Sequence, residues 1–112
     1  MITMLNPNAI PEGVLDTAII TETEGLSSYT IMPNVLTKLG TLASSVTLSL
    51  NTTSTGTNIV NIYDFIFTTS TTAPNITWPG GISWVVDTAP TINANKTYEV
   101  SIMNNLAICG EY

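Results

Sequence analysis

The chain has 112 residues, of which 44% are hydrophobic and only 9% are charged. An ordinary soluble domain carries about 25% charged residues, so Thr, Ser and Asn supply most of the polar surface here. The formal net charge is −6, and Lys38 and Lys96 are the only basic residues. Binding to phosphate needs a basic surface, so this balance argues against a nucleic-acid partner and against an anionic membrane.

The length predicts a single core, and the low charge content predicts that copies of the chain bury part of their surface in an oligomer. A Thr-rich secreted β-domain has the same composition and remains an alternative. No apolar run approaches the roughly 20 residues of a membrane-spanning helix. Met1–Pro7 lacks a basic region followed by an apolar stretch, which predicts no signal peptide and synthesis in the cytoplasm.

Two absences in the composition bear on chemistry. Cys109 is the only cysteine, so an internal disulfide is excluded, and its apolar neighbour Ile108 favours a buried thiol over a nucleophile. The chain contains no histidine, the commonest general base and transition-metal ligand. We therefore predict a protein that is not an enzyme and that needs no cofactor and no metal.

Residues 1–44 are predicted to form an extended N-terminal segment with one or two short helical turns. Pro11 and Glu12 suit the start of a helix, which predicts a helical turn over Glu12–Ile20. Val35–Leu42 carries apolar residues at helix-like spacing and predicts the second turn.

Residues 45–112 are predicted to form a β-domain. Val46–Leu50 alternates apolar and polar residues, as a strand with one buried face does. Asn104 and Asn105 predict a tight hairpin turn. Further strands are expected at Ile59–Thr68, Ile76–Trp78, Ile82–Val86, Thr97–Asn104 and Ala107–Tyr112. The expected fold is mainly β: a small antiparallel β-sandwich or jelly-roll-like domain.

The longest predicted strand, Ile59–Thr68, is apolar on both faces. Such a strand is typical of a position between two layers or in a subunit interface. We therefore take Ile62, Phe65 and Phe67 as candidates for a subunit interface. Tyr63 lies in the same strand and is a candidate for contact with a sugar.

A turn separates the two tryptophans. Pro79 suits the first central position of a type II turn and Gly80 the second, where φ is positive, and Gly81 follows. The turn is expected to bring Trp78 and Trp84 together. Two interpretations stay open, namely stacking on a sugar and plain packing in a core or interface.

The acidic residues of the β-domain match no known metal-binding loop. They are Asp64, Asp87, Glu99 and Glu111. A carbohydrate hydrolase that uses two of these carboxylates is the least favoured function.

Four segments follow one another in the C-terminal part of the chain: Ile76–Trp84, Ala89–Ile92, Asn95–Ile102 and Leu106–Tyr112. Their order and spacing resemble the C-terminal β-domain of head-fibre and tail-fibre proteins of tailed bacteriophages. Asn95 stands where that pattern prefers glycine, and Asn is the residue that best replaces glycine in a left-handed conformation. The resemblance implies a compact, usually trimeric knob on the particle surface, without catalytic residues.

These observations predict a structural virion protein made in the host cytoplasm and located at the virion surface. It is expected to be a short head fibre or capsid decoration subunit that assembles as a homotrimer. Residues 1–44 are expected to dock onto other virion proteins of the capsid or tail. The alternative is a tail-fibre knob that attaches to host-surface carbohydrate.

Overall fold

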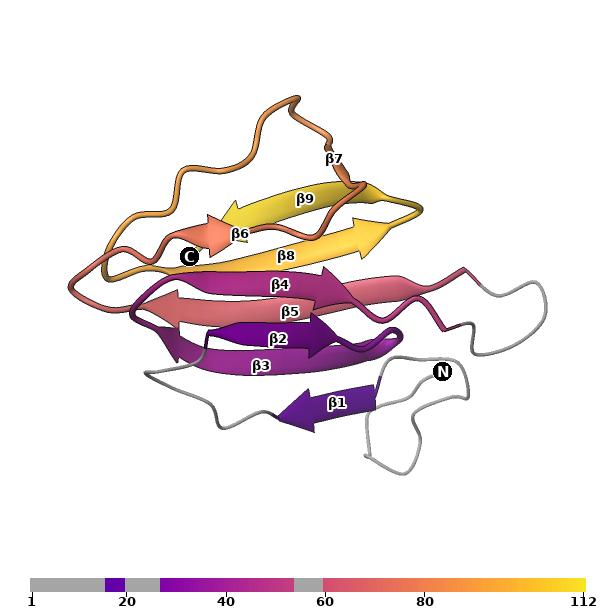
Figure 1. Cartoon of the computed structure of the whole chain (residues 1–112), viewed down its shortest axis with the longest axis horizontal. Coiled ribbons are helices and arrows are strands. Elements are labelled where there is room, and N and C mark those ends of the chain that lie inside the picture. The colour runs from indigo at the N-terminus through magenta and orange to yellow at the C-terminus, as the bar shows by residue number, and fades with distance from the viewer. Residues whose placement is uncertain (1–15, 20–26, 54–59) are drawn as a thin grey trace.

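The computed structural model describes residues 16–19, 27–53 and 60–112. Within these ranges the chain forms two stacked β-sheets and contains no helix, and therefore none that could cross a membrane (Figure 1). The strands are β1 (Asp16–Ile19), β2 (Ser28–Ile31), β3 (Val35–Leu42), β4 (Val46–Leu50), β5 (Ile62–Thr69), β6 (Ile76–Thr77), β7 (Ser83–Trp84), β8 (Thr97–Met103) and β9 (Leu106–Glu111).

Successive strands alternate between the two sheets as far as β7. The larger sheet has the order β1-β3-β5-β8-β9-β7, and the smaller sheet has the order β2-β4-β6. Figure 1 shows β2 and β4 stacked on β3 and β5, with the arrows of β2 and β4 pointing opposite to those of β3 and β5. Each full circuit of the chain through the two sheets therefore adds one strand to each sheet. Asp16 pairs with Val35 and Ser28 with Thr47, an equal separation along the chain in both sheets.

The predicted mainly β fold with two sheets is confirmed, but the predicted antiparallel, jelly-roll-like pairing is wrong. Among the described strands, only the pairs β5–β8 and β8–β9 are antiparallel. The pairs β1–β3, β2–β4, β3–β5, β4–β6 and β7–β9 are parallel. Alternating apolar residues mark a buried face but not the direction of the neighbouring strand. In the first four of these parallel pairs to be formed along the chain, β1–β3, β2–β4, β3–β5 and β4–β6, the chain returns through the other sheet between the two partners, so the partners run parallel.

The helical turn predicted over Val35–Leu42 is wrong, because this segment is β3. A bulge explains the helix-like spacing: the register with β5 shifts between Lys38 and Thr41, and Gly40 between them has a φ of 79°. The extra residue lets Leu39 and Leu42, three positions apart, both face the core.

The other predicted helical turn, Glu12–Ile20, is also wrong where the structure describes it. Asp16–Ile19 forms β1 and pairs in parallel with β3. The remaining residues of that prediction lie outside the described residues.

The predicted boundary at residue 44 falls inside the two-sheet domain. β2 and β3 precede it, yet they place Ile31, Leu39 and Leu42 in the same buried cluster as residues that follow it. The sheets therefore include residues 28–42. The docking role assigned to residues 1–44 stays a prediction.

One core fills the space between the sheets. In β5 the side chains alternate without exception, so that every second residue is buried. Phe67 is the centre of an aromatic group, with ring centroids 6.4 Å from Phe65, 6.4 Å from Trp78 and 5.4 Å from Tyr98. The other buried apolar residues are Ile31, Leu39, Leu42, Val46, Leu48, Tyr63, Val100, Ile102 and Ala107.

A buried threonine ties the end of β5 to the loop before β8. The Thr69 hydroxyl donates to the carbonyl of Asn93 at 2.7 Å and accepts from the backbone N–H of Lys96 at 2.9 Å. Thr69→Val is expected to lower the free energy of unfolding by about 1–3 kcal/mol, because both backbone groups lose a partner. Urea denaturation measures this. Thr68→Val on the outer face is the matched control, and an equal loss in both variants would contradict the role of the Thr69 hydroxyl.

Candidate assembly surface

The outer face of the larger sheet exposes a cluster of apolar side chains beside the β8–β9 hairpin. We call this cluster the apolar hairpin patch; it consists of Ile62, Val85, Met103, Leu106 and Ile108. The last four are 57%, 54%, 52% and 56% exposed, respectively, and Ile62 is half-buried. Together with Ser101 and Ile102 the patch lines a groove of about 380 Å³.

The hairpin turn sets the geometry of the apolar hairpin patch. Asn104 and Asn105 both have positive φ, 54° and 65°, as the two central residues of a tight hairpin turn require. This confirms the turn predicted there. Met103 consequently pairs with Leu106 across the hairpin, and Ile62 pairs with Met103 from β5. Three apolar side chains thus form one row across three strands.

A pair of carboxyl groups lies on the same outer face, on β5 and β8. Asp64 shares a hydrogen bond with Glu99, and the Tyr112 hydroxyl donates to Glu99 Oε1 at 2.6 Å. The pKa of Asp64 is raised to about 7, first by burial and then by the neighbouring Glu99 carboxylate, while a hydrogen bond from Ser101 opposes the shift. The bonds from Tyr112 and Asp64 lower the pKa of Glu99. Near neutral pH the pair therefore holds a proton for much of the time.

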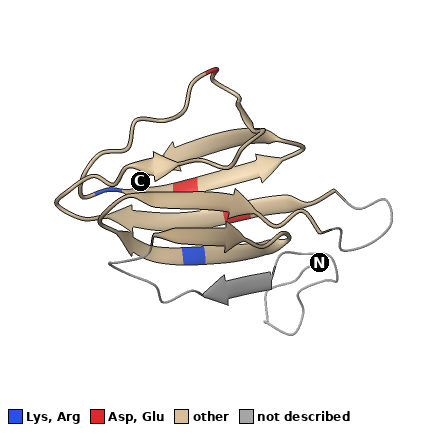
Figure 2. Ribbon diagram, in the orientation of Figure 1, with Lys and Arg blue, Asp and Glu red and all other residues tan. Residues whose placement is uncertain are grey.

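This carboxyl pair does not have the geometry of a carbohydrate hydrolase. Glycosidases hold their two carboxyl groups at least about 5 Å apart, with the sugar between them. Asp64 and Glu99 instead share a hydrogen bond on a sheet face. The described residues also contain no group of three or more potential metal ligands. Other charges are sparse in the described part of the chain (Figure 2).

The two tryptophans meet as predicted, with ring centroids 5.1 Å apart and an interplanar angle of 78°. Trp78 and Trp84 are both half-buried and pack against the core. The turn between them is placed one residue later than predicted. Gly81, not Gly80, has the positive φ, at 83°, and Pro79 is buried before the turn.

Gly81 is therefore the sensitive position of this turn. Gly81→Ala is expected to lower the free energy of unfolding by about 1–2 kcal/mol, the cost of a side chain in the left-handed region. A Cβ atom at either glycine meets no atom within 4 Å, so only backbone strain separates the two positions. Thermal denaturation of Gly81→Ala and Gly80→Ala checks this, and a larger loss at Gly80 would contradict the turn assignment.

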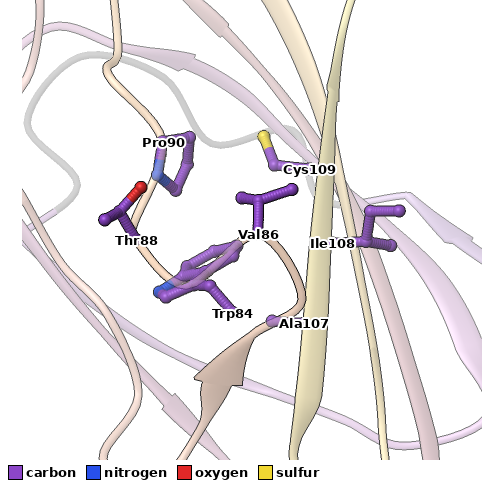
Figure 3. Close-up of a pocket in the computed structure, with 7 residues that line it drawn as sticks. All are labelled: Trp84, Val86, Thr88, Pro90, Ala107, Ile108 and Cys109. Atoms are coloured by element: carbon purple, nitrogen blue, oxygen red, sulfur yellow. The ribbon is translucent and has the colours of Figure 1, made fainter.

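A small cavity lies between the inner side of β9 and the loop that follows β7 (Figure 3). Its volume is about 50 Å³. Figure 3 shows Trp84, Val86 and Pro90 on the loop side, and Cys109 pointing away from Ile108 toward Val86. Burial raises the pKa of the half-buried Cys109 thiol, and nearby Glu111 adds to the shift. The thiol is therefore protonated near neutral pH and is a weak nucleophile.

The remaining candidates from the longest predicted strand separate into two groups. Phe65 and Phe67 are at most 1% exposed, so they cannot contact another subunit. Tyr63 is 6% exposed and its hydroxyl donates to the carbonyl of Asn51 at 2.7 Å, which leaves no ring face for a sugar. The protomer's own smaller sheet covers these side chains. Ile62 lies on the outer face and keeps its place as an interface candidate.

Sequence reasoning did not select most of the apolar hairpin patch. The signal was present in the hairpin: Met103, Leu106 and Ile108 alternate with the buried residues Ile102 and Ala107. Both faces of the hairpin are therefore apolar near its turn.

Comparison with known proteins identifies no relative, since no family model, curated protein or solved structure matches the chain. The function must be argued from the residues themselves.

Proposed function

We propose that this chain is a structural subunit at the surface of a tailed-phage particle, a short head fibre or capsid decoration protein without enzymatic activity. It assembles as a homo-oligomer, and the resemblance of its C-terminal segments to fibre knobs favours a trimer. The observation that carries the proposal is the apolar hairpin patch, four of whose side chains are more than half exposed. The largest exposed apolar patch of a soluble domain is often a functional surface.

Two measurements test this proposal. Light scattering coupled to size exclusion is expected to give a mass near three times that of the 11.9 kDa chain. Antibody labelling of purified particles is expected to find the protein on their surface. A protein that stays monomeric and is absent from particles contradicts the proposal.

We further propose that residues 1–44 dock onto another virion protein through the part that precedes β1. Deletion of residues 1–15 removes no residue of a described strand. The shortened chain is expected to keep its melting temperature but to be lost from particles, as measured by quantitative mass spectrometry of purified virions. Normal incorporation would contradict the docking role.

A second candidate function is attachment to host glycan through Trp84. The observation that favours it is a half-buried tryptophan at the sheet edge, beside Thr88 and Pro90. The cavity there is far smaller than the roughly 300 Å³ of the smallest usual ligand pockets, so a sugar must stack on the open surface. Glycan-array binding that is lost in Trp84→Ala and kept in Met32→Ala supports this function. Binding that survives in Trp84→Ala contradicts it.

A further inference from the structure

We propose that a second copy of this chain docks on the apolar hairpin patch, and that the neighbouring carboxyl groups of Asp64 and Glu99 make this contact depend on pH. The inference rests on the proposed self-assembly and deepens it, because it names the surface and the condition that controls it.

The size of the patch is suited to an interface core. The four exposed side chains, Val85, Met103, Leu106 and Ile108, present an area on the order of 400 Å², comparable to the largest apolar patch of a typical monomer. A stable interface buries about 800 Å² on each partner, with an apolar centre and a more polar rim. The half-buried neighbours on the same sheet face, including Ile62 and Ile66, extend the patch toward that size.

The charges near the patch favour a second copy over a basic partner. No member of the apolar hairpin patch is charged, and the nearby carboxyl groups are engaged within the chain. Asp64 bonds to Glu99 and Ser101, and Glu99 also accepts from Tyr112. The patch itself therefore offers a basic partner no carboxylate to pair with. Copies that meet at their hairpins around a symmetry axis cover apolar side chains with apolar side chains.

The carboxyl pair makes this contact sensitive to pH. Asp64 faces Glu99 and Ser101 on β8, Tyr112 after β9, and Leu36 directly opposite on β3. Lys38 is the cation on this sheet face, in the same row as Ile66 and Glu99. One oxygen, Asp64 Oδ1, is buried and has no hydrogen-bond partner among the described residues. The pair therefore has little means of stabilising a second negative charge.

A docked copy removes water from this pair and brings a like pair closer. Both effects disfavour the doubly charged form and raise the pKa of Asp64 above its value of about 7 in the single chain. Association is then accompanied by proton uptake, so it tightens as the pH falls through this range and weakens as the pH rises.

The test measures mass against protein concentration by light scattering at pH 5.5 and pH 8.5. We expect the dissociation constant of the wild-type chain to fall by roughly tenfold at the lower pH, as uptake of a single proton permits. Leu106→Asp is expected to be monomeric at both values. Met32→Asp, which changes an exposed apolar residue outside the patch, is the matched control and should behave as wild type. Asp64→Asn should have the same dissociation constant at pH 5.5 and at pH 8.5.

The possible failures are distinguishable. A wild-type oligomer that persists in folded Leu106→Asp overturns the assignment of the surface and leaves the proposed function intact. A monomeric Leu106→Asp together with the same pH dependence in Asp64→Asn as in wild type overturns the role of the carboxyl pair. A wild-type chain that is monomeric at both values overturns the proposed self-assembly itself, and a foreign partner must then cover the patch. Circular dichroism of each variant verifies that it is folded.

Discussion

Phe67→Ala is expected to lower the free energy of unfolding by about 3–5 kcal/mol, a large part of the 5–15 kcal/mol that stabilises a typical domain. Phe67 is 1% exposed and lies between Phe65 and Tyr98 on the larger sheet and Trp78, which follows the last strand of the smaller sheet. Its removal leaves a cavity where the two sheets meet. Urea denaturation followed by tryptophan fluorescence measures the loss.

The neighbouring residue provides the control for this prediction. Ile66 precedes Phe67 in β5 but points to the outer face, where it is half-buried. Ile66→Ala is expected to cost about 1 kcal/mol, because less apolar surface is returned to water. Similar losses in the two variants would mean that the inner and outer faces of β5 are wrongly assigned.

Asp64→Asn is expected to stabilise the folded chain above neutral pH and to remove most of the pH dependence between pH 5 and pH 8. The folded pKa of Asp64 is about 7, compared with 3.8 for a free side chain. The folded state therefore binds more protons than the unfolded state between these values, and stability falls as the pH rises from 4 to 7. Above pH 7 the Asp64 carboxylate is charged in the folded chain, so the folded state bears the full cost of holding that charge in a partly buried place. The uncharged side chain of Asp64→Asn bears no such cost.

Glu99 changes folding stability with pH in the opposite direction to Asp64, and it does so in a lower range of pH. Its folded pKa lies below the ordinary 4.5, so it contributes stability above pH 4.5 that is lost as the pH falls further. The slope between pH 5 and pH 8 therefore belongs to Asp64. After allowance for solvent screening, we expect Asp64→Asn to gain about 1–2 kcal/mol at pH 8, which corresponds to a rise in melting temperature of roughly 4–8 °C.

Melting temperatures at several pH values check this prediction. The monomeric Leu106→Asp background separates the effect on folding from the effect on association. Asp87→Asn is the matched control, because Asp87 is exposed in the loop after β7. If melting temperature depends on pH in Asp64→Asn as it does in wild type, or if that dependence disappears in Asp87→Asn, then Asp64 is not its cause.

Local patterns in the sequence predicted the strands well where one face is buried. The alternation in β4, β5 and β8 and the Asn104–Asn105 turn all appear in the structure. Asn95 has the left-handed φ of 58° expected where glycine is replaced. These features depend on a few neighbouring residues, and so a single sequence reveals them.

The errors concern features that depend on distant parts of the chain. The bulge at Gly40 imitates a helical period in β3, and only pairing with β5 shows that it is a strand. The interface candidates Ile62, Phe65 and Phe67 came from both faces of β5, whereas the smaller sheet covers the face that carries Phe65 and Phe67. The meeting of Asp64 and Glu99 depends on the β5–β8 register, which local periodicity does not determine.

The reversal of direction at β8 has a consequence for the growth of the fold. A stack of parallel strands in which each coil rests on the previous one has an open end, and another chain can extend it as an endless filament. In the larger sheet the antiparallel β8–β9 hairpin covers β5 and terminates the stack. In the smaller sheet the last strand, β6, has only two residues, and a proline follows soon after it. The C-terminal end of the described strands thus opposes the addition of a further parallel coil, and so opposes head-to-tail polymerisation of the chain.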